Sequence, residues 1–227
     1  MLSGADLMLG SLPALGWLWW IRRKDRCEPE PLHVVVAVFF LGAVAALATV
    51  WLRPRIEAFV LAHGAGAPER LLDAFVVTAA VEETLKFAAF ALGALWTAEW
   101  DEPLDGVVYG AAAGLGFAAI ENAFFVWATG DPNLALTRGF TATLAHVAFS
   151  GGFGLFVGLA RLRWCKLRWT WAAAGAIGAI ASHGAYDSWA VRGGGSRFEL
   201  FGSMLGLVLF LAIAIRWAHR RSTQCAT

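Results

Sequence analysis

The chain alternates apolar runs with short breaks that are charged or rich in glycine and proline. The runs are close to the roughly 20 mainly apolar residues that a helix needs to cross a bilayer. They lie at residues 5–21, 33–52, 71–96, 106–128, 135–160, 169–191 and 198–217. Since 59% of the 227 residues are hydrophobic and only 15% are charged, little is left for a water-soluble domain. We therefore predict an all-α fold, a single integral membrane domain over residues 1–227 that forms a polytopic helical bundle of about seven transmembrane helices.

The stretch between the second and third runs permits two structures. Residues 56–62 are apolar enough for a short helix at the membrane surface, and they equally suit a plain loop leading into the glycine-rich residues 63–68. In both cases we expect the second membrane helix to end near residue 52. The sequence has no internal repeat, which argues against transporter folds built from paired halves.

The distribution of lysine and arginine predicts the orientation of the bundle. Eleven of these 18 residues fall on the side that holds the break after the first run, the break after the fifth run and the C-terminal tail. Six fall on the other side, and Lys86 lies within a run. Because cytoplasmic loops are enriched in Lys and Arg, we place the protein in the cell membrane with its N-terminus outside and its C-terminus in the cytoplasm. All three cysteines then lie on the reducing side, so we expect no disulfide framework.

Ionisable side chains lie deep within four of the runs, where charge is costly. A charged group at the bilayer centre costs about 2.5–3.5 kcal/mol on insertion scales, so it usually faces a protein interior or a water cavity. At about 1.5 Å of rise per residue, these groups lie roughly 10–16 Å below the outer ends of their helices. They are Glu82, Glu121, His146 and His183, with Glu83, Lys86 and Asp187 beside them. We expect them to meet in one layer in the outer half of the membrane.

Spacing along the helices predicts how some of these side chains point. Adjacent residues diverge by about 100° around a helix, so only one of Glu82 and Glu83 can face a cavity, while the other is held by Lys86 or by a neighbouring helix. His183 and Asp187 are one turn apart, so the carboxylate can hold one imidazole nitrogen and fix the tautomer that the other nitrogen presents. A cap near the outer interface is an equally good role for Asp187.

Glycine recurs at every fourth position on the fourth and fifth runs. This spacing lets the backbones of two helices approach closely. Glu121 lies on the same stripe as these glycines, so we expect it to point into the bundle. The glycines are Gly106, Gly110 and Gly114 on the fourth run, and Gly154 and Gly158 on the fifth.

The polar set suits the hydrolysis of an amide bond. A glutamate base, an imidazole and a held water are the minimal equipment for that reaction, with further donors to stabilise the oxyanion. Glu82, His146 and His183 would equally form a zinc site with one position left for water, and the sequence does not separate the two mechanisms. Two non-enzymatic alternatives use the same polar layer. One is a non-catalytic membrane scaffold, and the other is a transporter that relays protons or ions. The apolar inner halves of the runs below Lys86 favour a one-sided site, and no basic stripe indicates nucleic acid.

Several motifs resemble those of the PrsW intramembrane proteases. The segment Glu82-Glu83-Thr84-Leu85-Lys86 matches Glu-Glu-x-x-Lys, the segment from Phe117 to Glu121 matches Phe-x-x-x-Glu, and His146 and His183 match the two later helix-borne histidines. The run Asp105-Gly106-Val107-Val108-Tyr109-Gly110 resembles the middle section of that family. The resemblance covers roughly residues 70–190, and we expect the catalytic core at about 71–191.

PrsW proteins are related to the type II CAAX prenyl endopeptidases and to bacteriocin-processing enzymes. Those relatives carry an arginine one position later than Lys86 and a histidine in place of Glu121. Both departures argue against a prenylated protein as the substrate.

The resemblance implies a glutamic-type intramembrane peptidase, with a metallopeptidase as the alternative. It implies that Glu82 with Glu83 activates the hydrolytic water and that Glu121, His146 and His183 complete the site, with Lys86 and Asp187 in support. The implied substrate is a single-span membrane protein in the lipid bilayer, such as an anti-sigma factor that receives its first cut near the outer face. No cofactor is implied with certainty, and zinc at Glu82, His146 and His183 is the candidate.

Overall fold

Most helices of this chain begin and end close to the limits of its apolar runs. The computed structural model describes residues 2–24, 29–63, 71–98, 100–162 and 168–190, together with scattered positions between 202 and 217. The described residues contain no strand, which confirms the predicted all-α fold. The helices are α1 (Gly4–Arg22), α2 (Leu32–His63), the π-helix η1 (Leu72–Ala80), α4 (Val81–Ala94), α5 (Pro103–Thr129), α6 (Asn133–Phe140), α7 (Ala142–Leu162) and α8 (Arg168–Ala190).

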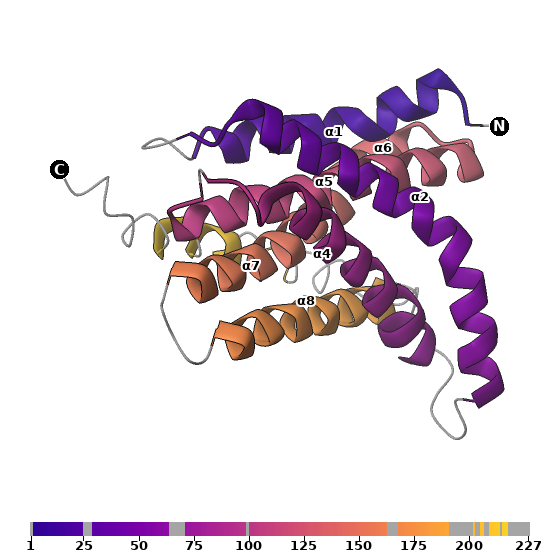
Figure 1. Ribbon diagram of the computed structural model, residues 1–227. Coiled ribbons are helices and arrows are strands. Elements are labelled where there is room, and N and C mark those ends of the chain that lie inside the picture. The colour runs from indigo at the N-terminus through magenta and orange to yellow at the C-terminus, as the bar shows by residue number, and fades with distance from the viewer. Residues whose placement is uncertain are drawn as a thin grey trace.

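Helix α5 is the centre of the bundle. Every residue from Pro103 to Ala119 is buried, because α1 and α2 pack along one side of α5 and α7 packs along another. Helix α8 packs against α7 and against η1, on the side of the bundle away from α1 (Figure 1). The strongly apolar character of α5 therefore reflects contact with other helices rather than with lipid.

Glycine brings α5 and α7 into backbone contact. A Cβ atom added at Gly106 would collide with the carbonyl oxygen of Gly154, and one added at Gly110 would collide with that of Ser150. The two glycine ladders of the sequence thus face each other. Because this contact leaves no room for sliding, it sets which residues lie opposite one another along the rest of the two helices.

Helix α2 is longer than the sequence predicted. It continues through Pro54 to His63, so the expectation that it ends near residue 52, with a separate surface helix or loop at 56–62, is wrong. The extension is held from the side, since it packs against η1 and the Arg53 guanidinium lies 3.3 Å from the Asp73 carboxylate. Tertiary contacts of this kind extend a helix past a proline that would end it in isolation.

The third run is not a uniform α-helix. Its first part, Leu72–Ala80, is a π-helix, and the α-helical part begins at Val81, one residue before Glu82. π-helices are rare and are concentrated at functional sites, so this change of geometry directs attention to the two glutamates that follow it.

The fifth run is two helices, not the single span predicted for residues 135–160. The break falls at Thr141, whose φ of −116° and ψ of −84° are not helical. The carbonyl of Gly139 accepts a hydrogen bond from Trp17 Nε1 at 2.9 Å, and Gly139 packs closely against Pro13. Contacts from α1 thus hold the end of α6, and the chain turns before α7 begins.

The described helices support a membrane location. Helices α2 and α5 and the segment Asn133–Arg161 are long and apolar enough to cross a bilayer. Helix α2 also turns large apolar side chains outward, among them Phe40, Val44 and Trp51. The seventh predicted run, 198–217, is described only at scattered positions, and those positions are helical.

Candidate active site

The polar residues singled out in the sequence meet beside one cavity. It has a volume of about 1140 Å³ and is lined by residues of α2, η1, α4, α5, α6, α7 and α8. Glu82, Glu121, His146, His183 and Asp187 all lie on its wall. Four helices that are distant in sequence therefore contribute to one site, and the remaining wall is rich in aromatic and aliphatic side chains.

The two adjacent glutamates are held differently. Glu83 is fully buried: its Oε1 accepts from Lys86 Nζ at 2.8 Å and from His183 Nδ1 at 2.7 Å. Glu82 lies on the cavity wall, and within the described residues its Oε2 has no hydrogen-bond partner. The nearest basic groups to that oxygen are Lys86 Nζ at 3.6 Å and His183 Nε2 at 3.8 Å. Of the pair, Glu82 thus faces the cavity and Glu83 anchors its neighbours.

His146 is fixed through both ring nitrogens. Lys86 Nζ lies 2.9 Å from Nδ1, and Glu121 Oε2 lies 2.9 Å from Nε2. Because an ammonium group can only donate, Nδ1 accepts and Nε2–H donates to Glu121. The ring packs beside Phe117, one turn before Glu121 on α5. The close pairing of α5 and α7 thus leaves a single orientation for this imidazole.

His183 also has carboxylates at both nitrogens. Its Nδ1 binds Glu83, and its Nε2 lies 3.3 Å from Asp187 Oδ2, one turn further along α8. The i,i+4 contact with Asp187 is one of the two roles that the sequence allowed for that residue, whereas the second carboxylate, from α4, was not expected. The ring of Phe149 stacks on the imidazole at a centroid distance of 5.4 Å, so His183 is held in its plane as well.

Arg138 completes the network and was missed as a site residue. Arg138 is one of the six Lys and Arg residues that the sequence places on the outer side, yet its Nη2 donates to Glu121 at 2.7 Å and its Nε donates to Asn122 at 2.7 Å. Asn122 in turn donates to Thr143 Oγ1 at 2.8 Å, and the guanidinium lies over the ring of Phe125. A signal was present, because Arg138 carries the one formal charge within residues 135–160.

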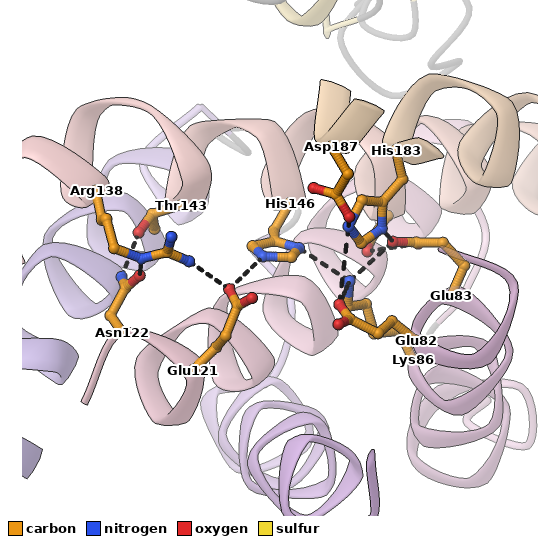
Figure 2. A network of polar contacts seen from close by, with 11 residues as sticks. Glu82, Glu83, Lys86, Glu121, Asn122, Arg138, Thr143, His146, His183 and Asp187 are labelled. Carbon is orange, nitrogen blue, oxygen red and sulfur yellow. Dashed lines mark hydrogen bonds and ion pairs between the residues drawn. The ribbon is translucent and has the colours of Figure 1, made fainter. Parts of the chain in front are cut away.

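Figure 2 shows the result, a line of linked acidic and basic groups that crosses from α6 to α8. Glu121 and Glu83 each lie between two donors, so charges that would be costly in lipid compensate one another. In order, the line runs through Arg138, Glu121, His146, Lys86, Glu83, His183 and Asp187. Glu82 lies beside this line, on the cavity side.

Three of these residues have the composition of a metal site. One ligand atom from each of Glu82, His146 and His183 lies within 4.8 Å of the others, and all three side chains are buried. A glutamate and two histidines are a ligand set that zinc accepts. Chemically, the arrangement suits activation of a water molecule, either by the Glu82 carboxylate alone or with a metal ion.

Comparisons with known proteins agree with this chemistry. Residues 30–215 match the profile of a family described as PrsW family intramembrane metalloprotease. A relative from Bacillus subtilis (strain 168) named Protease PrsW is 28% identical over 183 residues, which is 81% of either chain. One of the same name from Geobacillus kaustophilus (strain HTA426) is 29% identical over 218 residues, 96% of this chain and 90% of its own length. No solved structure matches the chain.

Proposed function

Because this chain belongs to the PrsW family of intramembrane proteases, we propose that it hydrolyses a peptide bond of a membrane-anchored protein with a water molecule activated by Glu82. The observation that supports this role most directly is the state of Glu82 Oε2. It is a buried carboxylate oxygen on the wall of the cavity, and among the described residues no donor satisfies it. A buried acceptor of this kind is suited to hold a water.

In this proposal the proton moves through Glu82 alone. The carboxylate takes a proton from water as the water oxygen bonds to the peptide carbonyl carbon, and it then gives that proton to the leaving nitrogen as the C–N bond breaks. His183 Nε2, 3.8 Å from Glu82, and His146 flank the reacting water. Glu83, Lys86 and Asp187 support these groups.

The cavity wall suits an unfolded segment of a membrane protein. Aromatic side chains of Phe117, Phe124, Phe149 and Tyr186 lie on it, near the acids and imidazoles. We propose a single-span membrane protein as the substrate, and by the resemblance an anti-sigma factor cut near the outer face. The helix ends around the cavity, at His63, Thr129 and Ala190, fall on the side that the arrangement of Lys and Arg predicts to be outside.

Substrate capture with an inactive variant tests the proposal. Full-length Glu82→Gln is expected to retain a bound membrane protein that mass spectrometry identifies, and the wild-type protein is expected to cleave it. Asp131→Asn is the matched control, since Asp131 is an exposed acid that does not line the cavity, and it should leave cleavage unchanged. Cleavage that persists in Glu82→Gln would overturn the role of this residue. A captured partner that is never cleaved would favour the scaffold alternative.

A zinc-dependent peptidase is the second candidate, favoured by the proximity of Glu82, His146 and His183. When bound, zinc would supply Lewis-acid activation of the water and of the carbonyl. Glu83 and Glu121 would orient the two imidazoles by accepting from their other nitrogens, as carboxylates commonly do for metal-bound histidines. This candidate requires Lys86 Nζ to leave His146 Nδ1, from which it lies 2.9 Å away. Loss of cleavage on chelation, restored by added zinc, would support it.

A further inference from the structure

Lys86 lies at the centre of the residues that would bind a metal ion. Its Nζ is 2.9 Å from His146 Nδ1, 2.8 Å from Glu83 Oε1 and 3.6 Å from Glu82 Oε2, and the side chain is fully buried. We infer that the Lys86 ammonium is the resident cation of this site and excludes a divalent metal ion from Glu82, His146 and His183. The inference rests on the site of the proposed function.

The conflict with a metal centres on one lone pair. Lys86 donates to His146 Nδ1, and the other nitrogen of that ring donates to Glu121. A metal ion must bind an imidazole through an unprotonated nitrogen, so it would need the same Nδ1 that the ammonium occupies. With Lys86 in place, the ligand set matches zinc in kind but is not free to bind it.

The rest of the surroundings suit a divalent cation. Glu121 accepts from His146 Nε2 and Glu83 accepts from His183 Nδ1, so each imidazole is already oriented by a carboxylate. A metal would bind His183 through Nε2, in place of a proton shared with Asp187 at 3.3 Å. Glu82 and Glu83 place two carboxylates around one ammonium. If the ammonium were removed, the two acids would lose their shared positive charge while His146 Nδ1 became free. Such a site is expected to bind zinc.

The ammonium also leaves Glu82 available for catalysis. At 3.6 Å it offsets the charge of Glu82 without a hydrogen bond to Oε2. Its contact with the face of Phe117, 4.1 Å from the ring centroid, holds it on the inner side of the site. Lys86 is therefore a positioning residue, which stabilises two acids and one imidazole from behind and does not contact the substrate.

The test compares metal binding in three full-length proteins purified from zinc-supplemented cells. They are wild type, Lys86→Met, which removes the charge but keeps an unbranched side chain, and Lys24→Met, a control at a lysine outside the site. We expect about one zinc per chain in Lys86→Met, as for a three-ligand site, and none bound stoichiometrically in the other two. Adding His183→Ala to Lys86→Met should abolish that zinc, and Co²⁺ in the single variant should give the visible absorption of a tetrahedral site.

Wild type alone can overturn the inference, so it does not depend on the folding of Lys86→Met. One tightly bound zinc per wild-type chain, lost in His146→Ala, would show that the ammonium does not exclude the metal. A folded Lys86→Met that binds no more zinc than wild type would do the same. Metal content is measured without a substrate, so a failure of the proposed proteolysis would be seen separately, as absent cleavage by a wild-type protein of known zinc content.

Discussion

The interface between α5 and α7 has two halves of opposite character. In one half, Gly106 and Gly154 bring the two backbones into contact. In the other half, Glu121 of α5 and His146 of α7 face each other at 2.9 Å, as part of the polar line that runs from Arg138 to Asp187. The same pair of helices is thus joined at one end by the absence of side chains and at the other by the most polar side chains of the bundle.

The comparison shows how one half depends on the other. Polar contacts near 2.9 Å require that the two helices neither slide nor separate, and close-packed backbones provide that constraint. The polar half tolerates buried charge because its groups compensate one another. Removing a single group therefore leaves an uncompensated buried charge, which destabilises the fold. Added side-chain volume should therefore destabilise the protein in the glycine half, and removal of a charge should destabilise it in the polar half.

The largest effect is expected from Glu83→Gln in the polar half. Glu83 binds both Lys86 and His183, and breaking a buried charge pair costs about 3–5 kcal/mol. Thermal unfolding of the full-length protein should show this loss. Glu82→Gln is the matched control: it should abolish cleavage with little loss of stability, because Glu82 Oε2 has no hydrogen-bond partner among the described residues. Equal destabilisation by the two changes would contradict the assignment of Glu83 to a structural role and of Glu82 to the cavity.

The next largest effect is expected from Gly106→Val in the glycine half. Its side chain would meet the carbonyl of Gly154, and overpacking of this kind costs about 1–3 kcal/mol. Thermal unfolding should detect the loss, and cleavage should fall because the contact of Glu121 with His146 is disturbed. Gly178→Val provides the control, since nothing lies within 4 Å of a Cβ atom at that position on α8. If both changes had the same effect, the glycine contact between α5 and α7 would not be what fixes the position of the two helices.

A smaller effect, on catalysis, is expected from Arg138→Met. Glu121 and Asn122 each lose a charge-assisted hydrogen bond, so His146 is held less firmly. We expect kcat on the captured substrate to fall about tenfold, equivalent to about 1.4 kcal/mol, with KM little changed. Arg55→Met, at an exposed arginine of α2 that does not line the cavity, should have no effect. A change confined to KM would instead indicate that Arg138 binds the substrate.

The smallest effect is expected at the edge of the network. Thr143→Val removes the acceptor of the hydrogen bond from Asn122 Nδ2 while keeping the shape of the side chain. Polar contacts between membrane helices average about 0.6 kcal/mol, so thermal unfolding should show a loss of that order. Cleavage should stay near the wild-type rate. A loss several times larger would mean that the stability of the network is not concentrated at Glu83 and Lys86.

Most of the helices could be predicted from the apolar runs, because the bilayer demands about 20 apolar residues whatever the partners of a helix are. The departures arose where another helix intervenes. Helix α2 passes Pro54 with support from η1, and the fifth run breaks at Thr141 where Trp17 and Pro13 hold Gly139. Such contacts join residues far apart in sequence, so no local pattern could reveal them. The orientation of the termini remains a prediction.

The sequence also identified most of the polar cluster by a depth argument. Glu82, Glu121, His146 and His183 were expected in one layer, and the structure brings them together. Arg138 was missed because it lies near a helix end, where an arginine can reach water and needs no partner. Arg138 belongs to the site only because α6 packs beside α5 and brings its guanidinium to Glu121.

By itself, the sequence determined that helices would form and which of their side chains were too costly to face lipid, because both follow from composition and period. Tertiary structure alone decided where those side chains point. Glu82 and Glu83 are chemically identical neighbours, and the choice between them depends on what packs against each face of α4. His183 and Lys86 hold Glu83 on one face, and the cavity lies on the other. That assignment makes one acid an anchor and leaves the other on the cavity wall.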